Sequence, residues 1–429
     1  MKKILHLLIL FTPLFSIGQF TAIPDANFEQ ALIDLGHDTG APDGQVLTAN
    51  ISGVTSLDVN TGSISDLTGI EDFTALNYLN FSDNQVASID LSQNVSINWL
   101  ECYYNHLTNL DVTQNTALTY LSCDGNLLTS LDVSQNSDLD ELACSGNQLT
   151  SLDLTQNAAL TYLFCPYNAI PSIDLTQNTA LTYLHCNNNQ LTSLNVSQNT
   201  ALTYLRCNSN QLASLDVTQN SDLVHLHCMD NQLTSLDVTQ NTALGHFYFD
   251  NNLLTSIDVT QNTALTNLYF EGNQLTSIDL SHNTVLISLT CNSNQLTGLD
   301  LSQNLHITYL SCYDNQMNCL NVKNGHNDTI VTFLVYNNPA LTCIEVDSVA
   351  YATLNWTVAG GNIDPGVTFS TNCSNACSST STALEEYSNQ PKKLIRIIDY
   401  LGRETTFKPN TPLIYQYDDG SVEKVMEVW

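Results

Sequence analysis

The segment LTYLSCDGNLLTSLDVSQNSD, residues 118–138, is one copy of a 21-residue unit that recurs with little change over residues 76–327. Leucine or isoleucine opens the copies, at residues 76, 97, 118, 139, 160, 181, 202, 223, 244, 265, 286 and 307. A looser 22-residue unit begins earlier, at Val54, and a last unit is expected to begin at Val331 after a three-residue insertion. A fixed period in this range predicts a solenoid of about 14 coils, whose core forms between stacked neighbours.

The unit has the pattern L-x-x-L-x-L/C-x-x-N-x-L-x-x-L, carried in one copy by Leu118, Leu121, Cys123, Asn126, Leu128 and Leu131. Over residues 54–346 the chain therefore resembles the leucine-rich repeat family, in the short-repeat form of exported Bacteroidetes-type proteins. The resemblance implies an α/β-type solenoid, a curved ribbon with one short parallel strand per coil on its concave face. The opposite face is expected to be irregular, because its segment LDVTQNTA is rich in turn-forming residues.

Residues 1–18 are predicted to be a signal peptide, with a basic start, a short apolar run and small residues at the cleavage site. The apolar run is too short to span a bilayer, and the sequence offers no later membrane-spanning candidate. We therefore expect export through the periplasm, to the medium or to the outer cell surface.

Residues 19–53 are expected to form an N-terminal helical cap. Asp25 is placed to cap a helix between residues 22 and 36. One face of this helix is expected to carry Phe28, Ala31, Leu32 and Leu35. Such a helix would cover the open end of the solenoid core.

Residues 347–383 are expected to form a C-terminal cap and a linker. We predict a disulfide between Cys343 and Cys373 at this end of the solenoid. Cys319 and Cys343 occupy equivalent positions in successive coils, so they form the competing pair.

Residues 384–429 are expected to form a small β domain, because KKLIRIIDYLGRE, PLIYQYDDG and SVEKVMEV have the composition of strands separated by turns. In residues 398–404 and 422–425 this tail resembles the C-terminal sorting domains of the type IX secretion system, although their N-terminal strands are missing. The alternative is a β cap without a targeting role.

The chain is strongly acidic, with 42 Asp and Glu against 10 Lys and Arg, and Arg206 is the one Lys or Arg between Ile4 and Val322. A net charge of −32 repels phosphate backbones and anionic lipid, which argues against nucleic acid and membrane partners. Much of the acidity is one ladder: Asp90, Asp111, Asp132, Asp153, Asp174, Asp216, Asp237, Asp258, Asp279 and Asp300, with Asn195 and Asn321 at equivalent positions. Each is expected to accept a backbone N–H in its own turn, and calcium bound between them is the alternative.

Two further ladders are assigned to the fold. Nine cysteines share one repeat position: Cys102, Cys123, Cys144, Cys165, Cys186, Cys207, Cys228, Cys291 and Cys312. Phe81, Phe249, Phe270 and Tyr336 are expected at the same position, so we predict a core site in which free cysteine acts as a small apolar residue. Twelve asparagines are predicted to bond backbone groups of adjacent coils: Asn84, Asn105, Asn126, Asn147, Asn168, Asn189, Asn210, Asn231, Asn252, Asn273, Asn294 and Asn315.

The strand positions that point away from the core vary between coils, and in coils six to ten they gather aromatic, His and Arg side chains. The candidate ligand-binding residues are Tyr183, His185, Tyr204, Arg206, His225, His227, His246, Tyr248 and Tyr269. Phe333 and Val335 are expected at these positions in the last coil. Aromatic residues and Arg are enriched in binding hot spots, although Tyr also suits exposed strands. Histidine titration near pH 6–7 is expected to make binding pH-dependent, and Arg206 disfavours a bound metal.

The sequence therefore predicts a secreted or cell-surface binding protein, adhesin-like and monomeric, that holds an extracellular protein or glycan on its concave face. No cofactor is expected, and without a nucleophile or metal motif no enzyme is expected either. The alternative is a structural or ordered-surface protein, whose Thr, Asn and Asp ladders template ice or a crystalline polysaccharide. Its threonine row is Thr108, Thr129, Thr150, Thr192, Thr234, Thr255, Thr276 and Thr297.

Overall fold

The computed structural model of the protein describes residues 18–374, residue 377 and the segments 394–398, 404–405, 413–417 and 422–425. The predicted signal peptide lies outside these residues except for its last position. The chain divides into two compact units, Met1–Ser378 and Ser379–Trp429, and each is described by itself. Among the described residues, no helix is long and apolar enough to cross a membrane.

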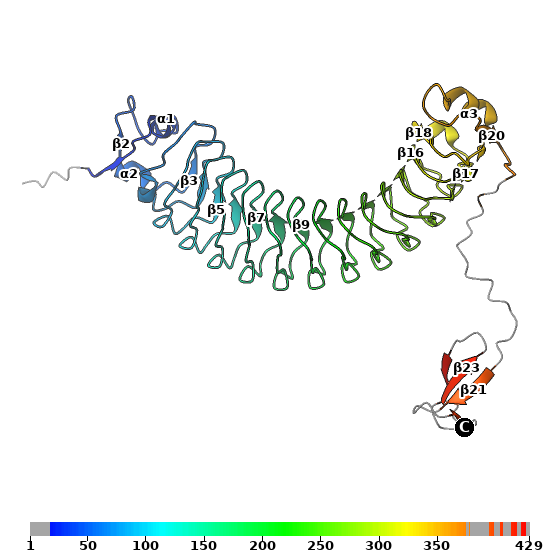
Figure 1. Ribbon diagram of the computed structural model, residues 1–429. Coiled ribbons are helices and arrows are strands. Elements are labelled where there is room, and N and C mark those ends of the chain that lie inside the picture. Colours follow the sequence, from blue (N-terminus) through cyan, green and yellow to red (C-terminus); the bar gives the residue numbers. More distant parts are fainter. Residues whose placement is uncertain are drawn as a thin grey trace, which may run out of the picture. The chain divides into compact units, whose positions relative to one another are not determined.

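The first unit is an arc in which 14 parallel strands form one continuous sheet along the inner, concave side (Figure 1). Each strand pairs with the same repeat position of the next coil, as Leu205 does with Leu226. The predicted leucine-rich repeat solenoid of about 14 coils is therefore confirmed. Its strands are β3 Ser56–Asp58, β4 Tyr78–Asn80, β5 Trp99–Glu101, β6 Tyr120–Ser122, β7 Glu141–Ala143, β8 Tyr162–Phe164, β9 Tyr183–His185, β10 Tyr204–Arg206, β11 His225–His227, β12 His246–Tyr248, β13 Asn267–Tyr269, β14 Ser288–Thr290, β16 Tyr309–Ser311 and β18 Thr332–Leu334.

The register of the last coil differs from the expected one. Tyr309 pairs with Thr332, and Leu310 pairs with Phe333, so the coil begins at Ile330 rather than Val331. Phe333 and Val335, which we expected on the concave face, are therefore buried in the core. The prediction was wrong because Val331 is as apolar as the true first residue, and only the strand pairing distinguishes the two.

The predicted asparagine ladder joins each coil to its neighbours. Asn210 Nδ2 donates to the carbonyl oxygens of Cys186 in the preceding coil and Cys207 in its own, at 3.1 and 3.0 Å. Its Oδ1 accepts the backbone N–H of Leu191 at 3.0 Å. The same pattern recurs at the other ladder positions, which confirms that these amides serve the fold.

A second asparagine ladder, which was not predicted, lies in the turn before each strand. Asn199 is completely buried, and its Nδ2 donates to Leu175 O and Asn178 O of the preceding coil. The full row is Asn94, Asn115, Asn136, Asn157, Asn178, Asn199, Asn220, Asn241, Asn262, Asn283 and Asn304. The Q-N step, which recurs at this position in every coil of the row but the one with His282–Asn283, is the sequence signal that marks it.

The aspartate ladder is used within individual turns, as predicted. Asp216 Oδ1 accepts the backbone N–H of Thr218 at 3.0 Å and its hydroxyl at 2.7 Å. Asn195 accepts the Ser197 N–H in the same way, at 3.1 Å. Because an amide oxygen can replace the carboxylate, the ladder is explained by backbone bonding without a cation.

The nine ladder cysteines are free and buried, which confirms their assignment to the core. Burial raises the pKa of the Cys165 and Cys207 thiols to about 12, so the thiols are protonated and inert at neutral pH. The last coil contributes Val335 at this position, not Tyr336. Phe249 and Phe270 interrupt the row and stack on each other with ring centroids 5.5 Å apart.

The N-terminal cap contains an antiparallel pair of strands and two helices. These are β1 Phe20–Ala22, α1 Ala26–Asp34, β2 Gln45–Leu47 and α2 Thr48–Ile51. Asp25 caps α1 by accepting the Asn27 and Phe28 N–H groups, and its second oxygen accepts the Ser65 N–H of the first coil. Phe28 is buried as expected, whereas Leu35 is 47% exposed because the helix ends before it.

The C-terminal end of the solenoid adds a second parallel sheet on the outer side, closed by a helix. It contains β15 Gly298–Asp300, β17 Cys319–Asn321, β19 Cys343–Glu345 and β20 Thr368–Ser370, with α3 Val349–Asn355 between the last two. Two short 3₁₀ segments, Ile70–Asp72 and Asn327–Thr329, complete the elements of this unit. The Trp356 ring stacks on Phe333 with centroids 3.9 Å apart, which seals the core.

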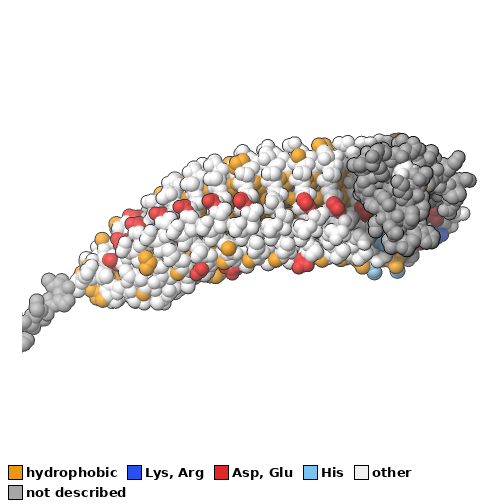
Figure 2. All heavy atoms as spheres, turned by 90° about the horizontal axis from the view of Figure 1, so that it is seen from below, with side chains coloured by type: hydrophobic (Ala, Val, Ile, Leu, Met, Phe, Trp, Pro, Cys, Tyr) orange, Lys and Arg blue, Asp and Glu red, His pale blue; other side chains and the backbone are white. Residues whose placement is uncertain are grey.

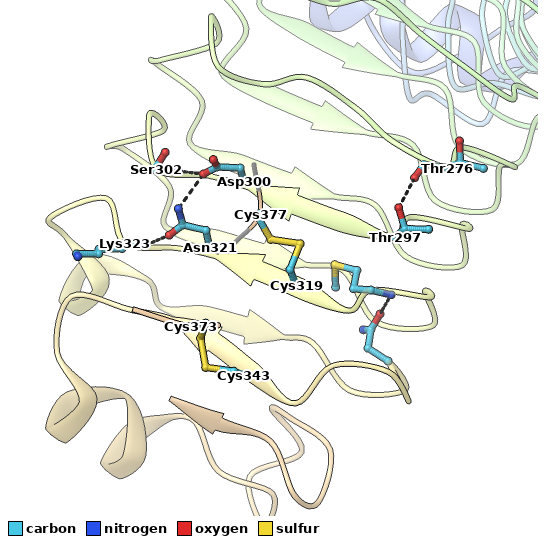
Figure 3. The surroundings of a disulfide bond; sticks show 12 residues. Thr276, Thr297, Asp300, Ser302, Cys319, Asn321, Lys323, Cys343, Cys373 and Cys377 are labelled. Atoms are coloured by element: carbon cyan, nitrogen blue, oxygen red, sulfur yellow. Dashed lines mark hydrogen bonds between the residues drawn. A yellow bond between two sulfur atoms is a disulfide. The ribbon is translucent and has the colours of Figure 1, made fainter. Parts of the chain in front are cut away.

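Two disulfides lie at this end (Figure 3). Cys343 bonds to Cys373, with Cα atoms 6.0 Å apart. Cys319 bonds to Cys377, with Cα atoms 5.4 Å apart, so the alternative Cys319–Cys343 pair does not form. The segment that leaves the solenoid is therefore tied to its last coils at two points.

The second unit contains a four-stranded antiparallel sheet with the order β22, β21, β23, β24. Its strands are β21 Leu394–Ile398, β22 Glu404–Thr405, β23 Leu413–Tyr417 and β24 Val422–Val425. The turns expected between these strands lie outside the described residues.

Removal of one ladder amide is expected to destabilise the solenoid. Asn210→Ala leaves the buried Leu191 N–H without an acceptor, which costs about 1–3 kcal/mol. We expect a lower urea midpoint and faster hydrogen exchange at the Leu191 amide. Gln211→Ala, at an exposed neighbouring position, is the control and should match the parent protein. Equal midpoints for both variants would contradict the role of the ladder.

The state of the 13 cysteines gives a second prediction. Native protein should show no reaction with a thiol reagent at pH 8, because the nine free thiols are buried. Denaturation should expose nine thiols, and denaturation with a reductant should expose all 13. Titration with 5,5′-dithiobis(2-nitrobenzoate), or mass spectrometry after alkylation, gives the count. Rapid labelling of a native ladder thiol would show that the core opens.

Candidate functional site

The nine candidate residues lie on five adjacent strands of the concave sheet, β9 to β13, and form the concave patch. The middle residue of each strand, such as Leu205 or Leu226, is buried, so the residues on either side of it face outward. Because the strands pair in register, Tyr204 lies beside Tyr183 and His225, and Arg206 lies beside His185 and His227. The patch therefore has two parallel columns of side chains.

The first column is a stack of rings. The rings of Tyr162, Tyr183 and Tyr204 are nearly parallel, with neighbouring centroids 4.4 Å apart. His225 follows at 5.4 Å with a tilted ring, and His246 stacks on His225 at 4.4 Å. These rings cover one another's faces, so their edges and polar atoms face the solvent.

The second column holds rings on either side of one charge. His227 stacks on Tyr248 at 4.3 Å, and Tyr248 stacks on Tyr269 at 4.5 Å. At the other end Phe164 meets His185 edge to face at 4.8 Å. Arg206 lies between His185 and His227, so it interrupts the column of rings.

The contacts of Arg206 are few. Its Nε donates to Asn208 Oδ1 at 2.9 Å. In the part of the chain that the structure describes, no carboxylate forms an ion pair with its guanidinium, and the one ion pair there joins Lys323 and Glu345. The side chain is partly buried, so its charge is only partly hydrated.

Two histidines of the patch, His185 and His227, are neutral at pH 7. Burial, followed by the charge of Arg206, lowers the pKa of both His185 and His227 to about 4. Burial and the neighbouring His246 also lower the pKa of His225. The titration that we expected near pH 6–7 is therefore wrong for His185 and His227, because packing and a nearby cation both oppose their protonation.

Four residues of the site were missed in the sequence. Tyr162 and Phe164 extend the two columns by one coil, and they could have been found by following the same positions backward. Asn187 and Asn208 lie two residues beyond His185 and Arg206, where both side chains are buried. The sequence signal for Asn187 and Asn208 is the variability of their repeat position, which holds Asp, Ser, Pro, Met and Tyr in other coils.

No group of three or more potential ligands that could hold a metal ion occurs among the described residues. The outer side differs from the concave patch: seen from below, acidic side chains form a row along the solenoid (Figure 2). The threonine row is exposed, and Thr297 Oγ1 donates to Thr276 O at 3.5 Å (Figure 3).

No family model and no curated protein sequence matches the chain. Among solved structures, the functional domain of InlJ from Listeria monocytogenes is similar to 96% of this chain. The match covers 99% of the InlJ domain at 30% identity, with a TM-score of 0.64. That domain is described as including a cysteine ladder.

Two further structures show the same fold at lower identity. The internalin InlF from Listeria monocytogenes is 24% identical, with a TM-score of 0.64, over 72% of this chain and 94% of that one. A leucine-rich repeat protein of Leptospira interrogans is 20% identical, with a TM-score of 0.54, over 75% of this chain and 97% of that one. On the extent and identity of the InlJ match, the chain belongs to the bacterial leucine-rich repeat proteins.

Proposed function

We propose that the protein binds a protein ligand on the concave patch. The observation that carries this proposal is the gathering of stacked Tyr and His rings around Arg206 on five adjacent strands. Solenoids of this kind use extended concave surfaces for binding. Rings that are already held by stacking lose little conformational freedom when a ligand arrives, which favours binding.

The arrangement of the rings favours a protein over a glycan. A sugar ring stacks on the open face of an aromatic ring, but the faces of Tyr183 and Tyr204 are covered by their neighbours. What remains accessible is ring edges and phenol groups. These groups can meet the mixed polar and apolar surface of a protein, and Tyr and Arg are enriched at the centres of such interfaces.

We also propose that this binding takes place outside the cell. Two disulfides support it, because structural disulfides persist in oxidising compartments. The predicted signal peptide provides export across the inner membrane. The antiparallel sheet of the second unit fits the proposed role of a type IX sorting domain, which would carry the protein to the cell surface or the medium.

The test compares two tyrosines at the same strand position. Full-length protein is presented to an array of extracellular proteins and glycans, beside Tyr204→Ala and Tyr309→Ala. Tyr204 is in the stack, whereas Tyr309 is 37% exposed and lies outside the patch, so it is a matched control. We expect binding to a protein that Tyr204→Ala weakens by about tenfold or more, and that Tyr309→Ala preserves.

Equal binding by both variants would place the ligand elsewhere on the solenoid. Binding to glycans alone, with the same dependence on Tyr204, would reverse the choice of ligand class. Ordered-surface binding would instead depend on the threonine row and be unaffected by either variant.

The neutral histidines give a pH prediction. The pKa of His185 and His227 is about 4 when folded and near the ordinary 6.5 when unfolded, so the unfolded chain binds more protons between these values. Their contribution to stability is therefore complete above about pH 6.5 and is lost as the pH falls toward 4. We expect the melting temperature of the parent to fall more between pH 7 and 4.5 than that of a His185→Asn, His227→Asn variant.

Carboxylates that titrate in this pH range change the melting temperatures of both proteins equally, because both proteins contain them. Asp250, whose pKa burial raises to about 6, responds in the opposite direction in each. Parallel melting curves for the two proteins across this range would contradict the lowered histidine pKa values.

A further inference from the structure

Arg206 is an unusual residue in this chain. It is the one Lys or Arg between Ile4 and Val322, in a protein whose net charge is −32. Acidic side chains are abundant, yet among the described residues none pairs with this guanidinium. A partly buried cation without a counter-charge is costly unless something neutralises it. The unpaired charge of Arg206 therefore lowers the stability of the folded protein at this point of the concave patch.

The side chains around Arg206 also lack partners. His185 is 9% exposed, and neither its Nδ1 nor its Nε2 forms a hydrogen bond with the described residues. The same holds for His227 Nε2 and for Asn187 Oδ1, and Asn187 is only 2% exposed. The other buried side-chain atoms without a partner among the described residues are the Oδ1 atoms of the second asparagine ladder, which recur in every coil. The group beside Arg206 departs from the repeat and adjoins an unpaired charge, and both features indicate a site that a ligand completes.

The geometry of this group is compact. His185, Arg206 and His227 occupy the same position on three neighbouring strands, β9, β10 and β11. Neighbouring strands lie about 4.8 Å apart, so the two histidines flank Arg206 at one strand spacing on either side. Asn208 holds the guanidinium through Nε at 2.9 Å, which leaves the terminal nitrogens free to point at a ligand.

We propose that Arg206, His185 and His227 form a subsite for a single carboxylate of the bound protein, supplied by an Asp or Glu side chain. This proposal rests on the proposed function and names the group that the concave patch recognises. The guanidinium offers paired N–H donors that match a carboxylate, and each neutral imidazole offers one more N–H. An acceptor with two oxygens can use all of them.

Charge limits the ligand to one isolated anion. The surrounding protein is strongly acidic, so a densely charged polyanion is repelled over most of the surface. A metal ion is disfavoured at the same place, because the fixed guanidinium repels it.

The subsite can be tested without knowing the partner. Full-length protein labelled with ¹³C at histidine is titrated with N-acetylaspartate N-methylamide and observed by NMR at the ring carbons. The matched probe is N-acetylasparagine N-methylamide, which has the same shape without the charge. N-acetylalanine, with its free chain-end carboxylate, distinguishes a terminal carboxylate from a side-chain carboxylate.

We expect the aspartate probe to shift the His185 and His227 signals in a saturable way, and the asparagine probe to leave them unchanged. Arg206→Gln should weaken this binding by at least about tenfold, the loss of a charge-assisted contact. Arg206→Lys should retain part of it, because the charge remains and the fork of donors is lost. Tyr309→Ala is the control for an unrelated concave change and should bind as the parent does.

The outcomes separate clearly. If N-acetylalanine shifts the signals and the aspartate probe does not, the subsite binds a carboxylate, but the carboxylate belongs to a chain end and not to an Asp or Glu side chain. No shift from any carboxylate, equal shifts from the asparagine probe, or unchanged binding in a folded Arg206→Gln protein would overturn the subsite. A protein partner that depends on Tyr204 but not on Arg206 would also overturn it and leave the proposed function standing. Carboxylate binding with no partner found would support the subsite alone.

Discussion

In the repeats of this solenoid a side chain lies beside the residue at the same position one coil away, because the 21-residue period and the in-register strands place equivalent positions one strand apart. A residue at a repeated position must therefore be compatible with a copy of itself in the next coil. Asparagine is compatible, since one amide carries donors and an acceptor and can bond two coils at once, as Asn210 does. An aspartate would repel its copy, so Asp216 turns its carboxylate toward the backbone of its own turn.

The same constraint shapes the concave patch. Flat side chains meet their copies face to face, which explains the stack of Tyr162, Tyr183 and Tyr204. A surface that repeats without change suits a regular lattice, whereas a discrete ligand requires one place that differs from the rest. Arg206 is such a place: it interrupts a column of rings, and the buried polar atoms next to it have no partner. Departure from the repeat is therefore the feature that marks the site.

Much of this could be predicted from the sequence, because a repeat shows many copies of each position. The parallel sheet and the role of the asparagine ladder followed from the resemblance to leucine-rich repeats. The core cysteines and the role of the Asp ladder followed from which residues replace one another. The errors fell where there is only one copy: the register after the insertion before Ile330, and the end of the helix at Leu35. The ring stacking and the low pKa of His185 depend on distances between coils, which the sequence does not contain.

Part of the net charge is a consequence of the fold and gives little information on the ligand. An aspartate closes the turn in ten coils, so a chain of many coils accumulates negative charge whatever it binds. The concave patch is exempt from this requirement, and its composition is free to follow function. There the low pKa values of His185 and His227 keep both imidazoles neutral at pH 7, so Arg206 carries the positive charge of this three-residue group. A ligand that approaches the group therefore meets one cation flanked by two neutral rings.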